Sequence, residues 1–361
     1  MMKFQYKAIV PVLTIATILV CGICYGREKR RDSRQEESNS FSMHTPKRSI
    51  YYWKTVFRLD DEERAFLDDH GIGRLYLRYF DVSYEPAGGD ETIIPNATIR
   101  FESAVPDSLE VVPTIFITNE AMCNWYYDET LADQVIYRIE AINLRNHIPQ
   151  IHEVQVDCDW TERSEPRFFD FCRQLRERLH RKGIALSSTI RLHQLREEAP
   201  PVDRGVLMCY NTGALRKLST ENSILSSHDV YTYLKRANWQ EFQLPLDIAY
   251  PTFGWSVMYD PEGRFKGLVR TTELSDTTVF RPLDGNRYEA RHNTAVANVA
   301  IPKGNILRLE QSDILTVLSV KQQLALLLKE HLPLDTSVIL YHLDSNNLSH
   351  YSHDEIEDLY R

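Results

Sequence analysis

Two aspartates, Asp157 and Asp159, stand two residues apart in the apolar run His152–Asp159 and could carry acid–base chemistry. Side chains alternate along a β-strand, so both carboxylates share one face while Cys158 points the other way. Two residues span about 6.6 Å of strand, close enough for each carboxylate to disfavour ionisation of the other and to raise the pKa of one. A structural alternative is that one aspartate accepts loop amide hydrogen bonds or pairs with an arginine such as Arg191.

Polar side chains follow three more apolar runs. Glu120 offers a carboxylate that could act as acid or base, although a helix cap or a loop ion pair would explain it equally well. Arg191 could neutralise the aspartates or bind a substrate carboxylate. His342 and Asp344 have an i, i+2 spacing, so both could face one side of a strand.

Six aromatic residues lie at the ends of these runs or just beyond them. Sugar rings stack their C–H faces on flat aromatic side chains while their hydroxyls meet carboxylates, so this mixture suits a carbohydrate. Ordinary core packing is the alternative, and we expect it for at least half of the six. They are Trp53, Trp160, Tyr210, Tyr250, Phe253 and Trp255.

The elements that position these residues alternate between short β-branched or aromatic runs and amphipathic stretches. The predicted strands are Ile50–Phe57, Arg74–Asp81, Glu110–Thr118, His152–Asp159, Ile184–Arg191, Gly205–Tyr210, Leu246–Pro251 and Ser337–Leu343. The predicted helices are Asp60–His70, Glu129–Asn146, Glu165–Lys182, Ser227–Ala237, Asp313–His331 and Ser352–Tyr360. Such alternation predicts an α/β fold, and eight strands indicate a closed (β/α)8 TIM barrel.

The chain is longer than a barrel requires. A barrel takes about 250 residues, so roughly 60 residues of the segment 49–361 should form an insertion. We expect it at 255–312, after the seventh strand, as a small antiparallel β-rich unit. Its predicted strands are Ser256–Tyr259, Gly267–Thr271, Arg287–Arg291 and Ala295–Ala300.

Composition limits the function. Of 361 residues, 43% are hydrophobic and 26% are charged, which is typical of a folded globular protein. The net charge is −9, and the first 48 residues carry nine basic and four acidic side chains, so residues 49–361 carry −14. Such an acidic body repels phosphate backbones, and we expect no nucleic acid partner. No glycine-rich phosphate loop, zinc-type spacing or nucleophile elbow occurs, so we expect no cofactor and no metal.

The amino-terminal segment is apolar from Ala8 to Cys24, between Lys7 and a charged stretch at 27–31. Residues 1–26 are therefore predicted to be a signal peptide or a membrane anchor, with lipidation of Cys24 or its neighbour Cys21 as an alternative. Residues 27–48 are polar and lack periodicity, which predicts a disordered linker. We expect an exported or cell-envelope protein that meets the membrane through this segment only.

Three motifs resemble those of the chitinase-like barrels, glycoside hydrolase family 18. The segment Val156–Trp160 is similar to the family's Asp-x-Asp-Trp-Glu strand end. Leu207–Asn211 is similar to its Met-x-Tyr-Asp/Asn, and Ala249–Gly254 to its Pro-Phe-Tyr-Gly. The expected insertion lies where many chitinases carry one.

The resemblance implies roles and also shows a departure. Asp159 would orient the acyl group of the sugar, Asp157 would tune Asp159, and Tyr210 would hold the reacting centre. In the family a glutamate after the tryptophan is the general acid, whereas this chain has Thr161 there and Glu162 one residue later. The general acid therefore has no secure counterpart.

The segment 52–360 is more similar still to a family of uncharacterised, often membrane-anchored bacterial barrel proteins. Three segments carry this resemblance: Gln155–Thr161, Ser188–Gln194 and Pro200–Arg204. It implies a fold and no assigned reaction.

Two functional hypotheses follow. The first is a glycoside hydrolase acting on an extracytoplasmic glycan, with Asp159 and either Glu120 or Glu162 as working carboxylates. The second, which Thr161 favours, is a catalytically inactive barrel that binds glycan or cell wall; an envelope scaffold is a further alternative. Hydrolysis needs two carboxyl groups about 5 to 9.5 Å apart, whereas a lectin needs only aromatic surface and hydrogen bonds. The candidate substrate-binding residues are Trp53, Trp160, Arg191, Asn211, Tyr250, Trp255 and Asp344.

Overall fold

The computed structural model describes residues 47–87, 90–127, 130–328 and 336–361. The chain divides into two compact units, Met1–Thr45 and Pro46–Arg361, and only the second contains described residues. The predicted signal or anchor at 1–26, and all but the last two residues of the predicted linker, lie outside them. Within the described ranges, no helix is both long and apolar enough to cross a bilayer.

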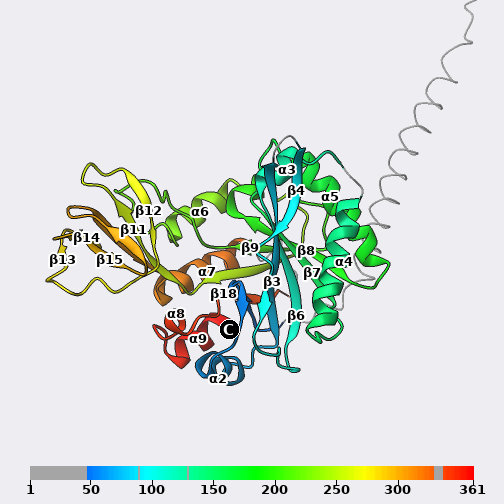
Figure 1. Ribbon diagram of the computed structural model, residues 1–361, viewed down its shortest axis with the longest axis horizontal. Helices are drawn as coiled ribbons and strands as arrows, with labels where there is room; N and C mark the ends of the chain where they lie inside the picture. The colour runs from blue at the N-terminus through cyan, green and yellow to red at the C-terminus, as the bar shows by residue number, and fades with distance from the viewer. Residues whose placement is uncertain (1–46, 88–89, 128–129, 329–335) are drawn as a thin grey trace, which may run out of the picture. The chain divides into compact units, whose positions relative to one another are not determined.

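Eight parallel strands close into a barrel (Figure 1). The closure is made by β1, which pairs in parallel with β3 on one side and with β18 on the other. This confirms the predicted (β/α)8 fold class. In chain order the strands are β1 (Ser49–Tyr52), β3 (Arg74–Ala87), β6 (Glu110–Ile117), β7 (Glu153–Cys158), β8 (Ala185–Arg191), β9 (Arg204–Met208), β10 (Leu246–Pro251) and β18 (Val338–Tyr341).

The alternation of side chains places polar groups inside the barrel. Gln155 of β7 accepts a hydrogen bond at 2.8 Å from the hydroxyl of Tyr51 in β1, which lies across the interior. Cys158 points the other way and lies beside Cys172 of the following helix, and both are buried free thiols. The alternation of side chains predicted for this strand is therefore confirmed.

Helices lie between the strands, as expected. Six match the predicted segments: α2 (Asp61–Asp69), α4 (Thr130–Arg145), α5 (Glu165–His180), α6 (Ser227–Lys235), α7 (Ile314–Leu328) and α9 (His353–Tyr360). Three short ones were not predicted: α3 (Asn119–Asn124), the 3-10 turn η1 (Leu192–Arg196) and α8 (Ser345–Leu348). The first two follow directly from a strand end, and α8 begins a few residues after β18. Thr118 and Asp344 cap the first turns of α3 and α8.

The second predicted strand, Arg74–Asp81, is longer than expected. It runs to Ala87 and folds back as β4 (Asp90–Asn96), which pairs with it antiparallel. The predicted strand Ile50–Phe57 is divided into β1 and the short β2 (Val56–Phe57), which pairs with β5 (Arg100–Phe101).

An antiparallel sheet follows β10, in the order β12-β11-β17-β14-β13. Its strands are β11 (Gly254–Tyr259), β12 (Phe265–Val269), β13 (Phe280–Pro282), β14 (Arg287–Ala290) and β17 (Ile306–Gln311). The single strand predicted at Ala295–Ala300 was wrong, because the chain turns there between β15 (Thr294–Val296) and β16 (Val299–Ile301). Ala297 and Asn298 make the turn with φ of 48° and 63°.

Candidate functional site

The carboxyl ends of the barrel strands bring Asp157 and Asp159 to one guanidinium, that of Arg191. Asp157, inside β7, accepts a hydrogen bond from the Thr189 hydroxyl at 2.6 Å and lies 3.4 Å from Arg191 Nη2. Asp159, one residue beyond the strand, accepts from Arg191 Nε. The side chain of Asp157 is 4% exposed and that of Asp159 58%. The two carboxylates share a face, as the spacing predicts, and they also share a cation.

Burial is the largest influence on the acidity of Asp157. It raises the pKa of this carboxyl, while Arg191 and the Thr189 hydroxyl oppose the rise and Asp159 adds to it. The direction agrees with the sequence prediction, but the neighbouring aspartate is a minor cause. Burial also disfavours the charge on Arg191, yet Asp157 and Asp159 together raise the pKa of this guanidinium, so it remains a cation.

An aromatic group lies within electrostatic reach of this ion pair, because Arg191 and Asp157 influence the pKa of both Tyr210 and Tyr341. Tyr341, at the end of β18, stacks on Tyr210 with ring centroids 4.9 Å apart and planes at 28°. It also contacts Trp53 at 6.0 Å and Phe253 at 5.7 Å. The Tyr210 hydroxyl is buried and has no hydrogen-bond partner among the described residues, and burial raises its pKa, so it is an unused O–H donor.

A second cation completes the site from β3. Arg78 donates from Nε to Asp81 at 2.8 Å, and its guanidinium lies 5.3 Å from the ring centroid of Trp53. Arg78, Thr189 and Tyr341 were not predicted from the sequence. They could have been found by alternation, because each is a polar or aromatic residue on the inward-facing side of a predicted strand. These side chains at the barrel end form a mouth cluster: Trp53, Arg78, Asp157, Asp159, Arg191, Tyr210 and Tyr341.

The inserted sheet positions one more aromatic residue. Trp255 of β11 is half-buried, packs on Phe253 at 5.1 Å, and donates from Nε1 to Glu310 Oε2 at 2.8 Å. The other oxygen of Glu310 accepts from Arg308 at 2.6 Å, and both of these side chains are fully buried. Ser223, in the segment before α6, also donates to Glu310 at 2.5 Å. A buried ion pair thus fixes Trp255 beside Phe253.

Two predicted carboxylates lie apart from this group. Glu120 is exposed in the first turn of α3, and Glu162 is exposed in the turn before α5. Within the part of the chain that is described, neither side chain has a hydrogen bond or ion pair with the mouth cluster. Thr161 is exposed and donates its backbone N–H to Ser164 Oγ at 2.9 Å. The structure therefore brings neither Glu120 nor Glu162 to the two aspartates.

Four other predicted binding residues lie outside the mouth cluster. Trp160 is 1% exposed and packs on Phe169 of α5, and Tyr250 is 2% exposed and lies beside Cys209. Neither offers a surface to a ligand, because both are packed outside the barrel interior. Asp344 caps α8 by accepting from the Asn347 N–H at 3.3 Å, and Asn211 is exposed beyond β9 at a φ of 55°.

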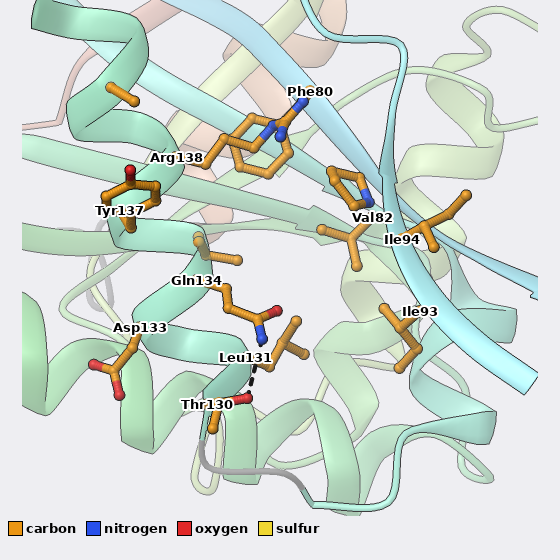
Figure 2. A pocket seen from close by; sticks show the side chains of 13 residues that line it. Phe80, Val82, Ile93, Ile94, Thr130, Leu131, Asp133, Gln134, Tyr137 and Arg138 are labelled. Carbon is orange, nitrogen blue, oxygen red and sulfur yellow. Dashed lines mark hydrogen bonds between the residues drawn. The ribbon is translucent and has the colours of Figure 1, made fainter.

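A cavity of about 580 Å³ lies elsewhere, between the β3–β4 hairpin and α4 (Figure 2). Its lining is mainly apolar, and the guanidinium of Arg138 covers Phe80 at 5.2 Å. None of the candidate residues lines it. The chemistry-bearing side chains are at the barrel end, so this hollow is not the site that the sequence indicates.

One group of side chains has the composition of a metal site: His70, His353 and Glu357. Arg48 already donates to both oxygens of Glu357, at 2.7 and 2.9 Å, and His70 Nδ1 lies 3.0 Å from one of them. The hydrogen bond from Arg48 is the main cause that lowers the pKa of Glu357 to about 2. A metal would have to displace this guanidinium, and we assign the group to stability.

No family model matches this chain, and no curated protein matches it. Solved structures with a similar fold include the Group IV chitinase of Ostrinia furnacalis, at 12% identity and a TM-score of 0.48, with 87% of this chain and 98% of that chain covered. The spore cortex-lytic enzyme SleL of Bacillus cereus has 13% identity and a TM-score of 0.49, with 87% and 75% covered. A chitinase of Chromobacterium violaceum has 13% identity and a TM-score of 0.45, with 87% of this chain and 98% of that chain covered. At these values the activity and substrate of those proteins do not transfer to this chain.

Proposed function

We propose that this protein binds a glycan at the mouth cluster. The observation that carries the proposal is the contact between half-buried Trp53 and Tyr341. Tyr341 lies within electrostatic reach of Arg191, the guanidinium that also binds the exposed carboxylate of Asp159. Pyranose rings present C–H faces that stack on such rings and hydroxyls that bond such a carboxylate. An acidic nucleic acid or lipid headgroup would gain little from this combination.

Polar groups around the rings support recognition of hydroxyl groups. Asp159 is mostly exposed and keeps one oxygen that is not engaged by Arg191. The buried hydroxyl of Tyr210 has no partner among the described residues, and an unpaired buried donor costs free energy, so a sugar oxygen that reached it would be bound favourably. A bound sugar would satisfy this donor.

Hydrolysis is the second candidate function, and one observation favours it. Asp157 is buried with a raised pKa, whereas Asp159 is exposed, and two carboxyl groups in different environments can divide the acid and base roles. Against it, both aspartates are held on the same guanidinium, and Glu120 and Glu162 lie apart from them. We therefore place binding first.

The binding experiment uses the full-length chain, purified in detergent, and two probes: N-acetylchitohexaose and a peptide-free tetrasaccharide of peptidoglycan. Calorimetry should detect binding of at least one probe by the wild-type chain. Trp53→Ala should weaken this binding about tenfold, since stacking contributes about 1 to 1.5 kcal/mol. Tyr137→Ala is the matched control, because Tyr137 is an exposed aromatic residue on α4 outside the barrel. Absence of binding to both probes, or equal effects of the two variants, would reject the proposal.

The same probes test hydrolysis. If Asp159 takes part in bond cleavage, released reducing ends should be detectable with the wild-type chain and absent with Asp159→Asn, while the affinity of the variant stays within about threefold. A lectin would release no reducing ends and would lose affinity in this variant.

We also propose that the barrel acts outside the cytoplasm. Support comes from the apolar segment 8–24 between basic residues, which lies outside the described residues. Fractionation of cells expressing the full chain with a carboxyl-terminal tag should place it in the envelope or the exported fraction. Recovery in the cytosol would reject this.

A further inference from the structure

Arg270 lies directly after β12, at the edge of the inserted sheet that adjoins Trp255. Ser256 Oγ donates to the carbonyl oxygen of Thr271 at 2.8 Å, and Thr271 N–H donates back to the Val269 carbonyl at 2.8 Å. The first bond holds the segment after β12 against the start of β11, next to Trp255, and the second makes a tight turn within that segment.

Gly254 permits this close approach. A Cβ at this position would lie 2.6 Å from Thr272 Cγ2 and 3.0 Å from the Glu310 carbonyl oxygen. Only a glycine therefore lets residues 270–272 pack on the first residue of β11, which directly follows Phe253. The segment that carries Arg270 is thus anchored at the aromatic edge of the mouth cluster.

The charge of Arg270 reaches the mouth cluster itself. Burial raises the pKa of Tyr341, and the positive charge of Arg270 is among the influences that oppose this rise. Arg270 acts in the same sense as burial on the neighbouring His342, whose pKa is lowered.

Other guanidiniums in this region are already held by carboxylates of the chain. Arg78 is bonded to Asp81, Arg191 to both aspartates of β7, and Arg308 to Glu310. Arg270 is exposed and has no ion pair with any described residue. It is a cation within electrostatic reach of Tyr341, and its hydrogen-bond donors remain available to a ligand.

We infer that Arg270 binds the carboxylate of an acidic sugar, so that the glycan recognised at the mouth cluster carries uronic acid or lactyl carboxylate groups. This inference rests on the proposed glycan binding. A guanidinium forms two parallel hydrogen bonds with a carboxylate, and the rings of Trp53 and Tyr341 would hold the pyranose next to it. The aspartates do not offset this attraction fully, because Arg191 partly neutralises them.

Calorimetry with the full-length chain tests the inference. The probes are an oligogalacturonate, a peptidoglycan tetrasaccharide with free lactyl carboxylates, and the carboxyl-reduced form of each. At least one acidic probe should bind about fivefold more tightly than its reduced form, the value of roughly 1 kcal/mol for an accessible charge pair. Which acid shows the preference distinguishes the two sources of the carboxylate.

Variants identify the residue. Arg270→Gln should remove the preference for the acidic probe and leave affinity for the reduced probe within twofold, while Arg270→Lys should restore part of the preference. Arg291→Gln is the matched control, because Arg291 is an exposed arginine of the same inserted segment. Equal affinity of the wild-type chain for acidic and reduced probes would overturn the inference and leave glycan binding intact. An unchanged preference in Arg270→Gln would also overturn it. Failure to bind every probe would reject the proposed function as well.

Discussion

Arg191 donates to Asp159 through Nε and lies 3.4 Å from Asp157 through Nη2, so a single guanidinium joins the two carboxylates of β7. This arrangement explains how a nearly buried aspartate is tolerated inside the barrel, because a buried carboxylate needs a partner and hydrogen bonds. It also places both carboxylates on one side of one cation, which suits positioning of sugar hydroxyls better than the flanking of a glycosidic bond.

Removing that guanidinium should destabilise the barrel. Arg191→Met retains the length of the side chain but leaves Asp157 buried without its cation, and we expect a loss of about 3 kcal/mol in the free energy of unfolding. Urea denaturation measures this loss. Adding Asp157→Asn should recover part of it, because the uncompensated charge disappears. Arg181→Met, which breaks an exposed helical pair with Glu177, should change stability by less than about 0.5 kcal/mol. No recovery in the double variant would contradict this account.

The buried ion pair of the inserted sheet should control Trp255. Glu310→Gln leaves Arg308 buried without a carboxylate and replaces the acceptor of the Trp255 indole with a neutral amide. We expect destabilisation of about 3 kcal/mol and a red-shifted tryptophan emission. The control is Glu289→Gln, which affects a pair with Arg281 on the surface of the same sheet. Similar emission spectra for the two variants would show that Glu310 does not position Trp255.

Acid should remove the stabilisation that Glu357 provides. Its pKa in the folded chain is about 2 against an ordinary 4.5, so its contribution is complete above pH 4.5 and is lost as the pH falls toward 2. Glu357→Gln lacks this contribution at every pH. The difference in Tm between the wild-type chain and the variant should therefore be largest near pH 6 and shrink between pH 4.5 and 2. A difference that stays constant over this range would refute the assignment of the low pKa to Glu357.

Gly205 should be required in β9. A Cβ there would lie 2.7 Å from Leu246 Cδ2 and 2.9 Å from Ile190 Cγ1, both in neighbouring strands. We expect Gly205→Ala to cost about 1 to 3 kcal/mol through overpacking, as measured by urea denaturation. Gly73→Ala is the control, because its nearest neighbour would be Lys47 Cδ at 3.7 Å, an ordinary contact. Equal stability of the two variants would contradict the packing argument.

The sequence predicted the strands and the parity of Asp157 and Asp159 because both depend on local periodicity. Arg78 and Tyr341 were missed because their place in the site depends on which strands are neighbours, and β1 joins β3 to β18 only when the barrel closes. The role predicted for Tyr250 in binding stays a prediction, although its side chain is buried. Tyr250 is three residues after Asp247, which bonds Arg204 of the adjacent strand, and so it faces the opposite side.

The turn within the predicted strand Ala295–Ala300 could not be predicted from residue types. Such turns usually contain glycine, whereas Ala297 and Asn298 adopt positive φ here without it. The extension of β3 as a hairpin with β4 was missed for a different reason. Pro95 and the polar residues near it interrupt the pattern of a strand, yet an edge strand tolerates them.

The central claim, glycan binding at the mouth cluster, is tested most directly by the indole N–H signals of the five tryptophans in a ¹⁵N-labelled full-length chain. Titration with the best-binding oligosaccharide should shift the signals of Trp53 and Trp255, assigned from single Trp→Phe variants, because sugar C–H groups would lie over these rings. The signals of Trp125, Trp160 and Trp239 should stay in place. Shifts confined to these three, or no shift at saturating oligosaccharide, would contradict the claim.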